Sequence, residues 1–204
     1  MGLISKKNGF TISGNLFLND KPLVPGIEKS IQPVFQDPGL YFNRTWTMQQ
    51  CLEEPFLLKG ISKEIAHKTI SSTLKLFSLD ESNLQKSSTN FSGGELQRLS
   101  ILRAFFYDPE ILLMDEPVSG LDRLVLLDTI DFMKKILKEK KITIFIVSHD
   151  LEFVQAISNY VYVIHKGKIV ESGETDEVMK SPKHDYTKQL LASRDLHGLK
   201  KELT

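Results

Sequence analysis

The chain has 204 residues, of which 41% are hydrophobic and 25% are charged, and its 26 basic residues balance its 26 acidic ones. These values exclude wholesale disorder and collagen-like or coiled-coil architectures, and a net charge of zero argues against nucleic acid as the partner. The single cysteine, Cys51, leaves no intramolecular disulfide and no cysteine-based zinc cluster within these residues. The longest apolar runs, such as 142–147, are strand-sized, whereas a membrane-spanning helix needs roughly 20 apolar residues.

The first elements expected along the chain are a hairpin and a short strand. Residues 10–20 alternate apolar and polar side chains, and Asn19-Asp20 followed by Lys21-Pro22 is a turn signal, which predicts an antiparallel hairpin. Residues 31–35 form a short apolar run that predicts a strand, and the loop that follows it begins at Gln36.

Amphipathic helices are predicted next, at 47–59 and at 62–79. Ser62 is a suitable N-cap for the second of them, and we expect Ile65 and Ile70 to face inward.

The second half of the chain alternates helices with apolar runs. The predicted order is a helix from 92 to 107, a strand at 111–114, a helix at 122–140, a strand at 142–147, a helix at 151–157, a hairpin at 160–171 and helices in the remainder. Continuous apolar runs are typical of strands buried on both faces of a parallel sheet. The alternation therefore predicts an α/β fold, and without a linker or repeat we expect a single domain.

Polar side chains follow the apolar strands where each strand ends. Asp115 and Glu116 follow one run and Ser148-His149-Asp150 the next, at the sheet edge where ligands bind in open α/β folds. Asp115 has the chemistry to hold Mg²⁺, Glu116 to deprotonate a water, and His149 to contact a γ-phosphate. Gln36 follows the earlier strand at 31–35, and its neutral amide can contact a metal-bound water. Taken singly, each residue also fits a helix cap or a turn.

The segment Ser92-Gly93-Gly94-Glu95 stands at a predicted helix start. Two glycines permit close backbone approach, and the free N–H groups of the first turn favour an anion. The plainer interpretation is an N-cap followed by flexible glycines.

Together, in this order, the motifs resemble the ATP-binding subunits of ABC transporters over essentially the whole chain. The matching motifs are the Q-loop at Gln36, the signature FSGGELQR at 91–98, the Walker B strand ILLMDEP at 111–117, the D-loop SGLD at 119–122 and the H-loop at His149. The resemblance implies a P-loop NTPase-like core sheet, a single ABC nucleotide-binding domain across 1–204 with a helical subdomain at about 40–108, and ATP with Mg²⁺ as cofactors.

The resemblance also implies roles for the residues at the strand ends. Asp115 would anchor the Mg²⁺ of Mg-ATP, and Gln36 would sense that Mg²⁺ and the attacking water. Glu116 would be the general base, and His149 would contact the γ-phosphate and hold the water.

A second set of residues is implied to act between two subunits. Ser92 and Gly94, within the motif that also contains Gly93 and Glu95, would contact nucleotide held by the opposite subunit. Asp122 would act across the same dimer interface. The motif reads SGGE where the family often has SGGQ, a change that we expect to be neutral.

One family motif is missing from the 204 residues. The Walker A sequence G-x-x-x-x-G-K-[ST] does not occur in them, and neither does the upstream aromatic residue that stacks on adenine. In the family these precede the stretch that here begins at Met1. We therefore expect an N-terminally truncated subunit in which the first strands and the Walker A helix are missing, and in which the runs 111–114 and 142–147 lose cover.

Two further segments resemble the importers of peptides and of nickel or related metal chelates. They are FQDPGLYFNRTWTMQQCLEEP at 35–55 and SPKHDYTKQLL at 181–191, the latter with Asp185 where the family often has proline. The resemblance implies a peripheral protein at the cytoplasmic face of the cell membrane, working with a second, non-identical ATPase subunit, two permease subunits and an extracytoplasmic solute-binding protein.

Two other functions are alternatives. A cytosolic ABC-type ATPase of DNA repair would carry a long coiled coil after the Q-loop, but only 56 positions separate Gln36 from Ser92 and they hold no heptads. A cytosolic ABC-type ATPase of translation would join two such domains in one chain, whereas these 204 residues hold one set of the motifs. A non-catalytic remnant is the other alternative, and the missing Walker A motif favours it.

We expect the 204-residue chain to bind Mg-ATP weakly or not at all, because the Walker A backbone and lysine supply most of the phosphate contacts. Isothermal titration of the chain with Mg-ATP measures this directly. Binding with a micromolar dissociation constant would show the expectation to be wrong.

Overall fold

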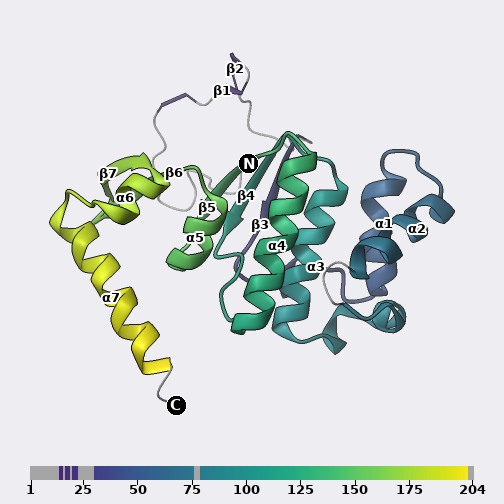
Figure 1. The fold of residues 1–204 in the computed structure, drawn as a ribbon. Helices are drawn as coiled ribbons and strands as arrows, with labels where there is room; N and C mark the ends of the chain where they lie inside the picture. Colours follow the sequence, from purple (N-terminus) through teal and green to yellow (C-terminus); the bar gives the residue numbers. More distant parts are fainter. Residues whose placement is uncertain (1–13, 16, 19, 23–29, 76–78, 202–204) are drawn as a thin grey trace, which may run out of the picture.

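The computed structural model describes residues 14–15, 17–18, 20–22, 30–75 and 79–201. Its centre is a sheet of three parallel strands in the order β3-β4-β5 (Figure 1). The strands are β3 (Ile31–Val34), β4 (Ile111–Asp115) and β5 (Thr143–Val147). The predicted parallel core sheet is thus confirmed, and the α/β fold with it.

Strand β3 lies at the edge of the described sheet. Pro33 stands opposite Leu113 in β4 and has no N–H to donate, which an edge strand tolerates when that position faces away from its neighbour. The carbonyl oxygen of Pro33 accepts a hydrogen bond from the hydroxyl of Tyr41 at 2.6 Å. The Tyr41 ring also lies against Phe35, with centroids 4.8 Å apart, so the start of the Gln36 loop is tied to the sheet.

The two apolar strands differ in burial. Leu112 and Met114 of the central strand β4 are 0% and 2% exposed, whereas Phe145 and Val147 of β5 are 57% and 53% exposed. The expectation that both strands are buried on both faces is therefore wrong for β5. The expected loss of cover is wrong for Leu112 and Met114 of β4, and in β5 one face is exposed. The exposure alternates along β5: Phe145 and Val147 lie on an uncovered face, whereas Ile144 and Ile146 on the other face pack against the core.

Helices α3 (Gly93–Phe106) and α4 (Arg123–Glu139) pack beside the sheet (Figure 1). Phe105 of α3 meets Phe132 of α4 edge to face, with ring centroids 5.9 Å apart. Both helices begin at capping side chains, Ser92 for α3 and Asp122 for α4, so the predicted starts of these two helices are confirmed.

A helical segment lies between β3 and α3 and extends to one side of the sheet (Figure 1). It consists of η2 (Pro38–Leu40), α1 (Met48–Leu57), α2 (Lys63–Leu74), η4 (Glu81–Gln85) and η5 (Ser88–Asn90). Ser62 caps α2 as predicted. Ile70 is buried, but Ile65 is 58% exposed, so its inward orientation was predicted wrongly. Helix α2 ends five residues before the predicted end, and residues 76–78 lie outside the described residues.

The N-terminal hairpin is present in short form, with β1 (Phe17–Leu18) antiparallel to β2 (Lys21–Pro22). Residues 10–13 of the predicted hairpin lie outside the described residues. After α5 (Leu151–Ile157), the chain forms the predicted hairpin of β6 (Tyr160–His165) and β7 (Lys168–Glu174), then α6 (Thr175–Lys180) and α7 (Asp185–Lys201). Within the described part of the chain, no helix combines the length and apolarity that a bilayer crossing requires.

We expect Phe132→Ala to lower the free energy of unfolding by about 3–5 kcal/mol, because it removes a ring that is 2% exposed and leaves a cavity beside Phe105. Chemical denaturation measures the change. Leu124→Ala on the same helix is the matched control, since Leu124 is 76% exposed, and its effect should stay within about 0.5 kcal/mol. Equal effects of the two changes would contradict the core assignment.

Candidate functional site

The carboxyl ends of the three parallel strands gather most of the predicted site residues at one edge of the sheet. Asp115 is the last residue of β4, and its Cα partner in β5 is Val147. Ser148 and His149 therefore follow β5 beside Glu116, which follows β4. Gln36 comes two residues after Val34, the end of β3. The side chains of Gln36, Asp115 and His149 are exposed, so the edge is open to a ligand.

The backbone of Glu116 is unusual. Its φ is +47°, in the left-handed region that a residue other than glycine seldom adopts. Its N–H still donates to the carbonyl of Val147 at 2.8 Å, so the chain leaves the sheet sharply right after the last ladder bond. The turn directs the Glu116 side chain toward the end of β5. Left-handed residues of this kind cost free energy and cluster at functional sites.

Glu116 is held by the two residues that follow β5. Its Oε1 accepts the backbone N–H of His149 at 3.1 Å, and its Oε2 accepts the hydroxyl of Ser148 at 3.3 Å. The same Oε2 lies 2.8 Å from Nδ1 of His149. The Glu116 side chain is 17% exposed and that of His149 is 78% exposed, so the carboxylate is sheltered while the imidazole reaches into solvent.

The contact with Glu116 changes the ionisation of His149. The hydrogen bond to the Glu116 carboxylate, and then its charge, raise the pKa of His149 above its ordinary value. Because the Nδ1 proton is held by Glu116, the other ring nitrogen, Nε2, points away from the carboxylate. The sequence identified Glu116 and His149 separately; the tertiary structure joins them into one hydrogen-bonded pair.

The N-terminus of α3 contains the predicted Ser92–Glu95 motif as a reciprocal cap. The N–H and hydroxyl of Ser92 both donate to Glu95 Oε2 at 2.8 Å, and the Glu95 N–H donates to Ser92 Oγ at 3.3 Å. The two hydrogen bonds from Ser92 lower the pKa of the Glu95 carboxyl, and the bond from the backbone N–H has the larger effect. The spacing Ser-x-x-Glu is the sequence signal of a capping box, so Glu95 acts as a helix cap, a role that the sequence interpretation did not assign to it.

The structure places this motif against the loop that leads into α4. A Cβ added to Gly94 would lie 3.2 Å from Cδ2 of Leu121, so glycine is required for this close approach unless Leu121 shifts. Asp122 follows directly and accepts the N–H of Val125 at 3.0 Å as the cap of α4. The predicted signature and D-loop motifs are therefore neighbours, and the short segment 117–121 connects Asp122 to Glu116.

The acidic residues at the strand ends suit a magnesium ion that arrives with a phosphate ligand. Among the described residues, no group of three or more His, Cys, Asp or Glu side chains is placed to hold a metal by itself. Mg²⁺ usually takes one or two carboxylates and completes its shell with water and substrate phosphates. Asp115, exposed at the end of β4, fits this requirement as a single carboxylate ligand.

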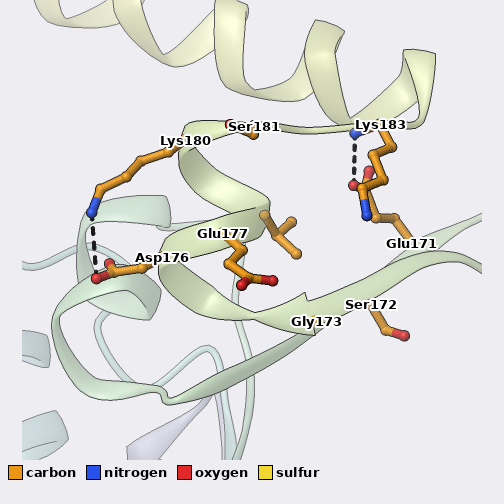
Figure 2. Close-up of a pocket in the computed structure, with 9 residues that line it drawn as sticks. Glu171, Ser172, Gly173, Asp176, Glu177, Lys180, Ser181 and Lys183 are labelled. Carbon is orange, nitrogen blue, oxygen red and sulfur yellow. Dashed lines mark hydrogen bonds and ion pairs between the residues drawn. The ribbon is translucent and has the colours of Figure 1, made fainter.

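A hollow of about 500 Å³ lies elsewhere, between β7, α6 and the segment before α7 (Figure 2). Glu171 on its wall accepts the backbone N–H groups of Lys183 and His184 at 2.7 and 3.0 Å. These two residues belong to the predicted segment 181–191. None of the predicted nucleotide-site residues lines this hollow. It lies where the segment 181–191 packs against the β6–β7 hairpin.

Comparisons with known proteins agree with this geometry. A family profile described as ABC transporter matches residues 3–119. The oligopeptide transport ATP-binding protein OppF of Streptococcus pyogenes serotype M1 is 35% identical over 167 residues, which are 81% of this chain and 54% of that protein. The chain thus spans about half the length of this relative.

Two solved structures are similar to the fold. cbiO1 from Clostridium perfringens, described as part of the ABC transporter complex cbiONQ, has a TM-score of 0.69 and 25% identity, covering 83% of this chain and 69% of its own. The ATP-binding cassette MJ0796 has a TM-score of 0.71 and 23% identity, covering 80% and 74%. They bear out the ABC ATPase fold predicted from the sequence.

We expect Glu116→Gln to move the pKa of His149 down toward its ordinary value, because the amide cannot supply the charge that holds the proton. The ion pair with Glu116 is complete below about pH 6.5 and is lost as the pH rises through the raised pKa of His149. An NMR titration of the His149 ring signals measures the midpoint. Glu110→Gln, at the opposite end of β4, should leave it in place. A midpoint that both variants share with the parent would refute the pairing.

Proposed function

Because the chain belongs to the ABC transporter family, we propose that it is the ATP-hydrolysing portion of the ATP-binding subunit of an oligopeptide importer. The observation that carries this proposal is the Glu116 cluster: a carboxylate on a left-handed residue, held by Ser148 and His149 at the carboxyl edge of a parallel sheet. The similarity to OppF, an oligopeptide transport ATP-binding protein, supports the class of substrate.

Mg-ATP, when bound, supplies the phosphoryl group and the metal charge that offsets its negative oxygens. Glu116 accepts the proton of the attacking water in our proposal. Oε2 of Glu116 already meets both the Ser148 hydroxyl and Nδ1 of His149, whereas Oε1 accepts one bond, from the backbone N–H of His149. Oε1 therefore keeps a second acceptor direction, so a water can donate to it without breaking the cluster. The bonds to His149 and Ser148 hold the carboxylate in one orientation, which a general base requires.

The neighbouring residues have complementary roles in this proposal. His149 presents Nε2 toward the γ-phosphate because its Nδ1 is held by Glu116, and its raised pKa favours the cationic form that attracts phosphate. Asp115 holds Mg²⁺. Gln36, on the loop that follows β3, contacts the Mg²⁺ and the attacking water through its neutral amide.

The start of α3 suits a phosphate from a second subunit. The N–H groups of Gly93 and Gly94 lie in the first turn, where a helix has no internal acceptor for them. Ser92 and Glu95 satisfy each other, so they orient these two amides and leave them to a ligand. We propose that two subunits meet head to tail with this motif and Asp122 facing the opposite nucleotide.

The assembly follows from the same proposal. The helical segment from about 40 to 108 would be the helical subdomain that meets the membrane subunits, within one nucleotide-binding domain across 1–204. The chain would act at the cytoplasmic face of the cell membrane, together with a second ATPase subunit, two permeases and a solute-binding protein. Nickel or another metal chelate is the alternative cargo, and a non-catalytic remnant is the alternative to an active enzyme.

In a form of this subunit that also carries a Walker A segment, we expect Glu116→Gln to abolish ATP hydrolysis by the membrane complex while ATP binding persists, because the amide cannot accept the proton of water. A cell whose only copy carries Glu116→Gln should lose uptake of labelled oligopeptides. ATP turnover and ATP binding are measured on the complex purified from native membranes, and uptake on intact cells.

Glu110→Gln is the matched control and should keep both activities. Parental turnover in Glu116→Gln would remove Glu116 as the base. A parent complex without ATP turnover would favour the remnant. Normal peptide uptake together with lost nickel uptake in the Glu116→Gln cell would overturn the peptide assignment.

A further inference from the structure

Helix α1 contains a proline in its interior. Pro55 lies near the end of α1 and is buried, and it has no N–H group. The carbonyl of Cys51, four residues earlier, therefore lacks the donor that an α-helix would normally supply. A buried carbonyl without a donor is costly, so this position requires a partner from outside the helix.

Arg103 of α3 supplies that partner. Its Nε donates to the Cys51 carbonyl at 3.2 Å, and its Nη2 forms an ion pair with the carboxylate of Glu54, the residue before the proline. One guanidinium thus meets two acceptors. The first is the carboxylate of Glu54, and the second is the Cys51 carbonyl, which Pro55 has left without a helical donor. The planar fork of arginine fits two acceptors at once, and a lysine ammonium does not.

Tyr107 completes the junction. Its ring lies 5.3 Å from the Arg103 guanidinium carbon, its hydroxyl accepts from Nη2 at 3.1 Å, and it donates to Glu54 at 3.3 Å. The Arg103 and Glu54 side chains are 17% and 32% exposed. Partial burial makes the ion pair less screened than a pair on the open surface. Arg103, Glu54 and Tyr107 therefore restrain one another.

A second set of contacts lies beside this one. The ammonium of Lys59, just after α1, donates to the carbonyl of Phe106 at 3.0 Å, and the rings of Phe56 and Phe106 lie 4.8 Å apart. The C-terminal ends of α1 and α3 are therefore joined along several residues. The Ser92 motif lies at the opposite end of α3 from these contacts.

The two joined helices connect different parts of the proposed nucleotide site. Helix α1 follows the Gln36 loop in the chain, and α3 begins at Ser92. The junction lies eleven residues along α3 from Ser92, about 16 Å at the helical rise. A tilt of about 5° at the junction would move the Ser92 end by more than about 1 Å by the same geometry, a displacement large enough to slow an enzyme strongly.

We propose that Glu54 and Pro55 form a two-point receptor for Arg103, and that Arg103 is a positioning residue that holds the Ser92–Gly94 end of α3 at a set distance from the Gln36 loop during ATP turnover. This inference rests on the proposed function. None of the three residues contacts nucleotide; they act through the angle between α1 and α3.

The role of Pro55 makes the proposal sharply testable. Pro55→Ala restores an N–H that competes with Arg103 for the Cys51 carbonyl, and it places a good helix former in a helix interior. A purely structural role predicts unchanged or higher stability together with unchanged turnover. The positioning role predicts unchanged or higher stability together with slower turnover.

Three measurements are made on the parent, Pro55→Ala, Arg103→Lys and the control Pro182→Ala, a proline that lies outside the helices. On the 204-residue chain, denaturation gives the stability, and NMR gives the solvent exchange of the Arg103 Nε–H. On the membrane complex, kcat and KM for ATP are measured. We expect Pro55→Ala to speed the Nε–H exchange, and both Pro55→Ala and Arg103→Lys to lower kcat about tenfold without changing KM.

Pro182→Ala should match the parent in all three measurements. Parental kcat in both Pro55→Ala and Arg103→Lys overturns the positioning role, and unchanged Nε–H exchange in Pro55→Ala overturns the two-point receptor. If Pro55→Ala proves less stable than the parent, Arg103→Lys decides the kinetic question. A parent complex without ATP turnover overturns the proposed function, and the exchange measurement on the chain still decides whether the receptor exists.

Discussion

The parallel pairing of β4 with β5 is the constraint on which the candidate site depends. Asp115 and Val147 are in register, so the residues that follow them leave the sheet side by side. The N–H of Glu116 makes one more ladder bond, to the Val147 carbonyl, before the left-handed backbone of Glu116 turns the chain away. A shift of one residue in this register would exchange the two faces of the strand and separate Glu116 from Ser148 and His149.

The same pairing places the loop that leads from β4 to α4. This loop runs from Glu116 to Asp122 and carries Leu121 against Gly94 at the start of α3. The strand-end residues and the helix N-terminus are consequently parts of one connected structure.

Side chains cap the starts of α3 and α4, and the start of α3 also has backbone amides that suit phosphate. Ser92 and Asp122 are caps first, since each accepts N–H groups of its own helix. The capping leaves the first amides of α3 oriented and without an internal acceptor. Capping and anion binding therefore use different atoms of the same short segment, which explains how one motif can serve both the fold and the proposed activity.

By itself, the sequence determined the order of strands and helices, the helix starts at Ser62, Ser92 and Asp122, and the identity of the polar residues at the strand ends, because periodicity, capping chemistry and residue order are local properties. Only the tertiary structure decided that Glu116 pairs with His149, that Gly94 meets Leu121, that Arg103 occupies the carbonyl left without a helical donor by Pro55, and that Phe145 and Val147 are exposed while Leu112 and Met114 are buried. These contacts join residues 27 to 52 positions apart in the sequence, and burial depends on which element lies against a strand, so neither follows from a local pattern.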